Sequence, residues 1–198
     1  LNNVADFTIQ GCICNGTGNA AIGNVYGFLF ANGTRVGSVV AAQAIGTNAQ
    51  SLSFGFNLEQ TTQAIRLEGC LAQGQTGAGG SVADGFLVVG DNHILENCKA
   101  VQNKDVGFAV GIRTLSYNNI VVQGCTSQNN DYGFQSFPTS GSMIIFRINV
   151  AVGNRIIGFE DELFGPMPVL INCFVDNLAI NNPSGGAAQN FFSGPPDT

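Results

Sequence analysis

Residues 94–103 read ILENCKAVQN and residues 121–130 read VVQGCTSQNN, and these two runs repeat one pattern. In each run an aliphatic residue stands three places before a cysteine and a small residue stands two places after it. A turn rich in Asn and Gln follows, and both runs then reach a Gly-Phe pair, at Gly107-Phe108 and Gly133-Phe134. An internal repeat of about 20–50 residues predicts an array of stacked structural units.

The pattern recurs along almost the whole chain at intervals of roughly 24–30 residues. The cysteine position is occupied in turn by Cys12, Ala42, Cys70, Cys98, Cys125, Asn149 and Cys173. The aliphatic position three places earlier holds Ile9, Val39, Leu67, Leu95, Val122, Phe146 and Leu170. The Gly-Phe pairs supply Phe28, Phe56, Phe86, Phe108, Phe134 and Phe159. The agreement of several positions over seven copies predicts about seven coils.

The type of coil follows from the short apolar runs inside each copy. No copy has the 3.6-residue apolar periodicity of a helical repeat, and Gly and Asn, which tolerate positive φ, interrupt the runs. We therefore expect an all-β fold, a parallel β-helix with three short strands per coil. Its inward side chains should form ladders about 4.8 Å apart, with like residues on like. Residues 1–181 would form this solenoid, and residues 182–198 an irregular tail that could cap it.

At this point the chain resembles the right-handed parallel β-helix proteins of the pectin-lyase-like superfold, over roughly residues 4–181. The resemblance lies in the repeat of an aliphatic residue, a Gly or Asn, a corner residue, a small residue and a later Gly-Phe pair. In those proteins the corner residue is often an inward Asn that forms a ladder; here Cys takes that position and Asn149 replaces it in the sixth copy. The resemblance implies a right-handed single-stranded solenoid and is nearly silent on activity.

Composition narrows the classes of function. The chain has 198 residues, seven Lys and Arg, and a net charge of −6, which argues against a nucleic-acid binder because phosphate neutralisation needs a basic surface. No apolar run reaches about 18 residues, so we expect no membrane span. The chain starts at Leu1 with residues that read like the interior of a coil, which suggests a processed product or a fragment.

The six cysteines and the single histidine do not predict a metal site or a cofactor. Five of the cysteines share the repeat position, whereas a zinc site needs close pairs that converge. We expect a ladder of small buried thiols, with strand spacing slightly too wide for relaxed disulfides. His93 falls on the inward side of its strand, where a hydrogen-bonded structural role is favoured over a catalytic one.

An enzymatic reading depends on two glutamates. Glu68 and Glu96 should occupy one outward column on adjacent coils, about 5 Å apart, with Arg66 beside them and Arg147 two coils further. Two carboxylates about 5–9.5 Å apart are what glycoside hydrolysis requires, so the chain could be a polysaccharide lyase or glycoside hydrolase. The sequence signatures of galacturonases and the acidic calcium cluster of pectate lyases are absent, and a repeat also places like residues in register without function. We therefore lean against an enzyme.

A second outward feature is apolar. The sequence predicts a stripe on the C-terminal half of one face, made of Ile94, Val121, Ile145, Val169 and Ile171. A contiguous exposed apolar patch of this length is unusual on a monomer. Three readings remain open: the stripe is an interface in a homo-oligomer or filament, residues 181–198 fold back over it, or the assumed register is wrong.

Three long loops, at 17–26, 47–54 and 75–84, follow the corners of the first three copies and should stack into one lobe. The expected function is a structural or interaction module, extracellular or displayed on a cell or virion surface, that forms oligomers or filaments and presents loops to a partner. The alternative is a protein that binds or cleaves a polysaccharide.

Overall fold

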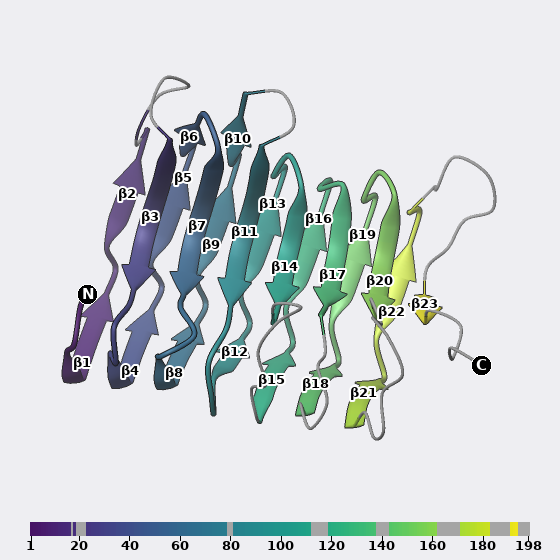
Figure 1. The fold of residues 1–198 in the computed structure, drawn as a ribbon. Helices are drawn as coiled ribbons and strands as arrows, with labels where there is room; N and C mark the ends of the chain where they lie inside the picture. Colours follow the sequence, from purple (N-terminus) through teal and green to yellow (C-terminus); the bar gives the residue numbers. More distant parts are fainter. Residues whose placement is uncertain are drawn as a thin grey trace.

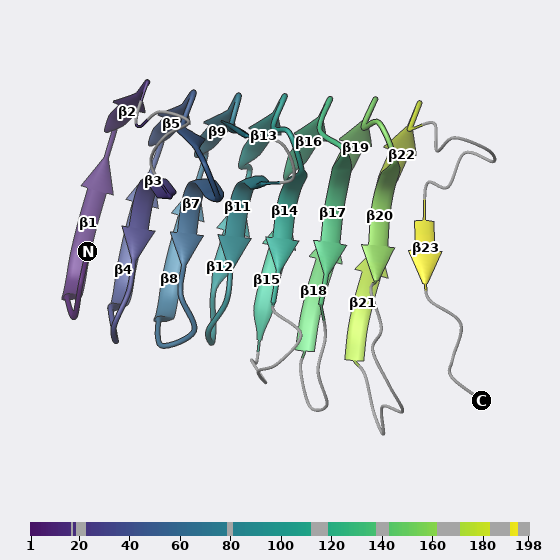
Figure 2. The same cartoon turned by 45° about the horizontal axis from the view of Figure 1, so that its top comes forward.

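The computed structural model describes residues 1–16, 18, 23–78, 81–111, 119–137, 143–161, 171–182 and 191–193. These residues form strands, turns and connections and contain no helix, and every strand pairing among them is parallel. The coils lie side by side from the N-terminal end to the C-terminal end (Figure 1), and the same order is seen after rotation (Figure 2). The predicted all-β parallel solenoid is confirmed.

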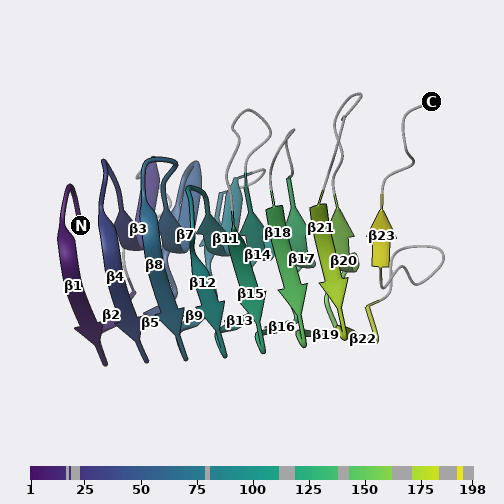
Figure 3. The ribbon, with the colours of Figure 1, turned by 90° about the horizontal axis from the view of Figure 1, so that it is seen from below.

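Three seven-stranded sheets form the walls of the solenoid. Sheet 1 contains β1 (Ala5–Gln10), β4 (Arg35–Val40), β8 (Gln63–Glu68), β12 (Ile94–Glu96), β15 (Ile120–Gln123), β18 (Met143–Arg147) and β21 (Ile171–Val175). Sheet 2 contains β2 (Ile13–Asn15), β5 (Gln43–Ile45), β9 (Leu71–Gln73), β13 (Lys99–Val101), β16 (Thr126–Gln128), β19 (Val150–Val152) and β22 (Leu178–Ile180). Sheet 3 contains β3 (Asn24–Phe30), β7 (Leu52–Leu58), β11 (Val82–Val88), β14 (Val106–Val110), β17 (Tyr132–Ser136), β20 (Ile157–Asp161) and β23 (Phe191–Ser193). Seen from below, sheet 1 lies in front of sheet 3 (Figure 3).

The core is a set of stacks in which each side chain lies on its equivalent in the next coil. The largest stack runs the length of sheet 3, with neighbouring ring centroids 4.7–4.9 Å apart and ring planes within 6° of parallel. It consists of Phe28, Phe56, Phe86, Phe108, Phe134 and Phe159. Offset stacking contributes about 0.5–1.5 kcal/mol per aromatic pair beyond area burial. The predicted Phe column is therefore the largest continuous stack of side chains in the core.

The glycine before each Phe is required by space. A Cβ added at Gly107 would lie 2.3 Å from Ser127 Oγ and 2.7 Å from the carbonyl oxygen of Gly133 in the next coil. Gly55 and Gly85 are equally close to a carbonyl oxygen of the coil that follows. The Gly-Phe pair thus combines one residue that permits close approach of the coils with one that fills the interior.

The corner between sheets 1 and 2 holds the predicted cysteine column. Buried thiols donate to carbonyls of the preceding coil: Cys70 Sγ to Val39 O at 3.4 Å, Cys98 Sγ to Leu67 O at 3.4 Å. Asn149 occupies the same place and donates its Nδ2 to Val122 O at 2.9 Å, while its Oδ1 accepts the N–H of Cys125 at 2.8 Å. The thiols therefore substitute for the amide of an asparagine ladder.

The corner between sheets 2 and 3 holds a second polar ladder, which the sequence analysis did not identify. From Gln75 onward, each side-chain oxygen accepts a backbone N–H from the coil before, at 3.1 Å from Gln75 N to Asn103 Oδ1 and at 2.8 Å from Asn103 N to Asn130 Oδ1. Each amide nitrogen also donates to a carbonyl of the preceding coil. The ladder comprises Thr47, Gln75, Asn103, Asn130, Asn154 and Asn182. It satisfies backbone groups that would otherwise be buried unpaired.

The predicted register of the last coil is wrong by four residues. Phe146 lies opposite Phe174 rather than Leu170, and Ile145 lies opposite Cys173. Asn177, not Cys173, continues the cysteine column, because its Oδ1 accepts the Asn149 N–H at 2.9 Å and its Nδ2 donates to Phe146 O at 2.9 Å. Two hydrogen bonds to the coil before it fix this register.

Two further features concern the ends and the loops. Within residues 182–198, the segment Phe191–Ser193 forms β23 and pairs with β20 in sheet 3, so this part of the tail adds a strand rather than folding over sheet 1.

Two of the long loops stack as predicted, because β6 (Asn48–Ala49) and β10 (Thr76–Gly77) form a parallel pair above the coils (Figure 1).

Candidate functional site

The outer face of sheet 1 carries the residues that the enzymatic reading singled out. Glu68 pairs with Glu96 across β8 and β12, Glu96 pairs with Gln123, and Gln123 pairs with Arg147. The predicted column of outward side chains on successive coils is thus present. In each of these strands the residue immediately before the column faces inward and is buried, as Leu67 and Leu95 show.

Hydrogen bonds connect this column into one polar ladder. Arg66 forms ion pairs with both glutamates: its Nη2 lies 3.3 Å from Glu68 Oε2, and the same nitrogen pairs with Glu96 Oε2 on β12. Gln123 donates its Nε2 to Glu96 Oε1 at 2.9 Å, and Arg147 donates its Nε to Gln123 Oε1 at 2.6 Å. The polar ladder therefore spans four coils.

This arrangement can bind a polar surface more readily than it can catalyse hydrolysis. A glycosidase needs one carboxyl group held protonated in apolar surroundings beside a second that is ionised. Here one guanidinium contacts both carboxylates, and the surroundings of Arg66 and Glu68 are largely open to solvent. The two glutamates are brought together as predicted, but both pair with the same guanidinium and neither lies in apolar surroundings.

The predicted apolar stripe is present only in part. Ile94, Val121 and Ile145 lie opposite one another on β12, β15 and β18, with Ile94 exposed and the other two half-buried. Val169 lies outside the residues that the structure describes. Ile171 pairs with Met143, and the position in the Arg147 column that the sequence analysis gave to Ile171 belongs to Val175. The stripe continues the column of Arg66, which lies opposite Ile94.

His93 is structural. Its side chain is fully buried, its Nδ1 accepts the Ile65 N–H at 3.1 Å, and its Nε2 lies 3.1 Å from Thr62 Oγ1. Since Nδ1 is an acceptor, Nε2 carries the proton and donates to the threonine. Burial lowers the pKa of His93 to about 4, so the ring is neutral at physiological pH. The interpretation of His93 as a hydrogen-bonded core residue agrees with these contacts.

A row of carboxylates near the corner of sheets 2 and 3 was not anticipated. Asp84 is buried and accepts the Val106 N–H at 3.1 Å; burial, followed by the charge of Asp105, raises the pKa of Asp84 well above its usual value. Burial and the charge of Asp131 raise the pKa of Asp105 in turn. Asp131 is ion-paired with Arg155. Over the described ranges, no group of three or more His, Cys, Asp or Glu side chains could hold a metal ion.

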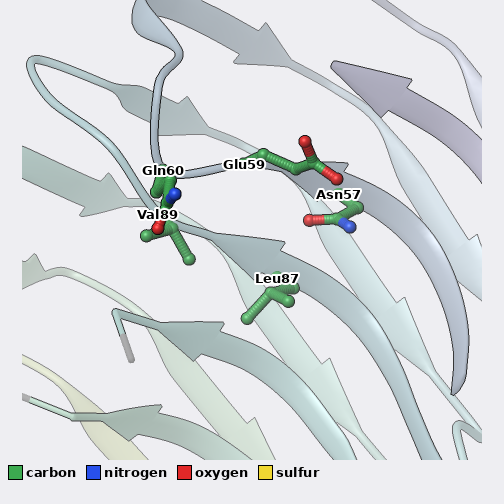
Figure 4. A pocket seen from close by; sticks show the side chains of 5 residues that line it. All are labelled: Asn57, Glu59, Gln60, Leu87 and Val89. Atoms are coloured by element: carbon green, nitrogen blue, oxygen red, sulfur yellow. The ribbon is translucent and has the colours of Figure 1, made fainter. Parts of the chain in front are cut away.

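A pocket of about 330 Å³ lies on the outer side of sheet 3, between β7, β11 and the loop after β7. It is lined by Asn57, Glu59, Gln60, Leu87 and Val89 (Figure 4). Nothing in the sequence pattern marked it, because these positions belong to no repeating column of one residue type.

Comparisons with family models, with curated proteins and with solved structures found no match to this chain. In the part of the chain that the structure covers, no helix is long and apolar enough to cross a lipid bilayer.

Proposed function

We propose that this protein is a rigid structural and interaction module whose copies assemble end to end through their terminal coils. The observation that carries the proposal is the complementarity of the two open ends of the solenoid. Open strand edges are templates for pairing with another chain. Here the first and last coils expose backbone N–H and C=O groups at the same spacing as the groups that hydrogen-bond neighbouring coils within the chain.

The last coil ends two rows of backbone hydrogen bonds. One row closes with Ile148 N donating to Val175 O at 3.0 Å, and the next donor in that row, Asp176 N–H, has no acceptor among the described residues. The other row closes with Leu178 N donating to Asn149 O at 2.8 Å, which leaves the Asn177 carbonyl without a donor in the same set. A further coil could satisfy both groups.

The first coil has the matching groups. By register, Gln10 occupies the position of Val175 and Ile13 the position of Leu178. A second copy placed on the last coil would therefore accept the Asp176 N–H with Gln10 O and donate its Ile13 N–H to Asn177 O. Exposed large apolar side chains also gather at these two coils: Leu1 and Ile13 at one end, and Val175, Leu178 and Ile180 at the other.

A charge swap tests this assembly. In a head-to-tail stack Ile13 of one copy would lie beside Leu178 of the next. Ile13→Lys together with Leu178→Lys should therefore abolish association, and Ile13→Lys together with Leu178→Glu should restore it. Ile94→Lys, which adds the same charge to the side of the rod, serves as the control and should leave association unchanged.

The measurements are light scattering over a range of protein concentration and electron microscopy of the same samples. Wild-type protein that stays monomeric at every concentration would contradict the assembly, as would association that both paired variants retain. The proposed setting is extracellular, on a cell envelope or virion, with the lobe of β6 and β10 available to a partner.

The second candidate is a polysaccharide-binding or polysaccharide-cleaving β-helix, of the lyase or hydrolase kind. The polar ladder from Arg66 to Arg147 favours it, since a row of charged and amide groups suits an extended polar polymer. Incubation with a panel of polysaccharides tests it. Binding or cleavage that Glu96→Gln weakens would support this candidate, and wild-type protein that neither binds nor cleaves any of them would exclude it.

A further inference from the structure

The pocket on sheet 3 contains a polar side chain whose position is hard to explain by folding alone. Asn57 is 5% exposed, and its Oδ1 has no hydrogen-bond partner within the described part of the chain. A buried polar atom without a partner costs about 1–3 kcal/mol. Native proteins retain few such atoms, and each invites a specific explanation.

The neighbouring coils show what this position holds when only packing matters. In sheet 3 Asn57 lies directly opposite Leu29 on β3 and Leu87 on β11. Leucine thus precedes and follows Asn57 in one column, and leucine at position 57 would leave no polar atom unpaired. The fold itself does not require the asparagine.

The surroundings of Asn57 define the chemistry of a ligand. The Asn57 side chain lines the pocket, and the Glu59 side chain lies beside it (Figure 4). Glu59 is half-buried, and no basic side chain among the described residues pairs with it. Leu87 and Val89 supply an apolar wall. A cation that only donates hydrogen bonds, carried on an aliphatic stem, matches these three features.

We propose that this pocket binds a primary alkylammonium group, either a lysine side chain of a partner protein or a free aliphatic amine. An ammonium group has three donors and no acceptor, so it can bond Asn57 Oδ1 and the Glu59 carboxylate together. The methylene stem packs on Leu87 and Val89, as lysine stems do on apolar surfaces. The Asn57 amide reaches the ligand by turning about χ2, a torsion with a broad range. The net charge of −6 favours the approach of a cation.

The experiment is a titration followed by amide and methyl chemical shifts. The probes are n-butylamine, 1,5-diaminopentane and Nα-acetyl-lysine methylamide, each fully protonated at pH 7. Saturable shifts centred on Leu87 and Val89 are expected, with dissociation constants of about 1 mM, as suits a fragment-sized ligand. The lysine derivative binding as well as the free amines assigns the site to a lysine side chain, and binding of the amines alone assigns it to a free amine.

Two variants separate the ligand site from a structural defect. Asn57→Leu should lose binding at least tenfold while unfolding at a higher temperature, since it removes the unpaired amide. Glu59→Gln should weaken binding about fivefold, the range of a partly exposed ion pair. Asp6→Asn, at an exposed position of β1 in sheet 1, is the control and should bind like the wild type.

Absence of saturable shifts in the wild type would overturn the proposal, as would binding that Asn57→Leu retains. Equal shifts with methyl glucoside or with Nε-acetyl-lysine would also overturn it, because neither carries an ammonium group. The result is independent of end-to-end assembly, which is followed in the same samples by light scattering and involves Ile13 and Leu178 instead.

Discussion

The ring of Phe86 lies flat against the ring of Phe108, with their centroids 4.7 Å apart and their planes 2° from parallel. The two residues are register partners in β11 and β14, although the 17 residues between these strands pass through β12 of sheet 1 and β13 of sheet 2 before the chain returns to sheet 3. The distance equals the spacing of neighbouring strands in a sheet, about 4.7–4.9 Å. Each coil therefore presents the next one with a complete template, in side chains as well as in backbone groups.

Gly107→Ala should destabilise the protein by about 1–3 kcal/mol, the usual effect of overpacking a tight interior. The new methyl group would meet the Gly133 carbonyl oxygen at 2.7 Å, and a backbone atom cannot move aside without shifting the coil. Urea unfolding measures the change. Gly23→Ala is the matched control, because a Cβ at Gly23 meets nothing within 4 Å. Equal stability of the two variants would contradict the close approach of the coils.

Thiol labelling should modify Cys12 long before Cys98. Cys12 is exposed, whereas Cys98 is buried and its burial raises the pKa of its thiol well above the ordinary value. Only the thiolate reacts appreciably, so both burial and the raised pKa slow Cys98. Peptide mapping after timed alkylation at pH 8 gives the order, and alkylation in denaturant supplies the control in which the two react alike. Similar native rates would rule out the buried thiol ladder.

The stability of the protein should depend on pH through His93. Its folded-state pKa of about 4 lies below the unfolded value of about 6.5, so between these values the unfolded chain binds the extra proton. The His93 contribution is therefore complete above pH 6.5 and falls as the pH drops toward 4, by up to about 3 kcal/mol. Denaturant unfolding of wild type and His93→Gln across this window should show a steeper acid loss in the wild type.

The raised pKa of Asp84 affects stability in the opposite sense, because the folded state favours the protonated carboxyl group. The contribution of Asp84 to the free energy of unfolding therefore falls as the pH rises above the unfolded-state pKa near 3.8. The difference between wild type and His93→Gln removes this background. Parallel pH profiles of the two proteins would contradict the buried neutral imidazole.

Ile148→Asn should stabilise the protein by about 1 kcal/mol. Ile148 has φ 55°, a left-handed conformation that is strained for a β-branched residue, and its side chain is 64% exposed. The equivalent corner position holds Asn97 at φ 53°, which tolerates this conformation. Thermal unfolding checks the gain. Ile94→Asn, at an exposed strand position without positive φ, is the comparison and should not stabilise.

Sequence reasoning located the solenoid because large and small inward residues recur in fixed order. Phe108 and Cys98 identify their columns at once, since few other residue types share those positions. The predicted register of the last coil was wrong for the same reason, because Leu170 and Cys173 match the residue types of the aliphatic and cysteine columns. The hydrogen bonds that fix the register are made instead by the side-chain amide of Asn177. A rule that gave weight to asparagine beside cysteine would have found the correct pairing.

The candidate sites were less accessible from the sequence. The Glu68–Glu96 column could be predicted because it lies on the same strands as the aliphatic column. The pocket of Asn57 could not, because burial on an outer face depends on how the loop after β7 meets the next coil. Only the folded structure reveals that Asn57 Oδ1 has no hydrogen-bond partner among the described residues.

The stacking of phenylalanines is the claim on which the rest depends, and ring-to-ring nuclear Overhauser effects test it most directly. With Phe selectively labelled, the ring protons of Phe108 should show strong contacts to both Phe86 and Phe134, each on a neighbouring coil. A Phe108 ring that contacts neither of them would contradict the stacked solenoid.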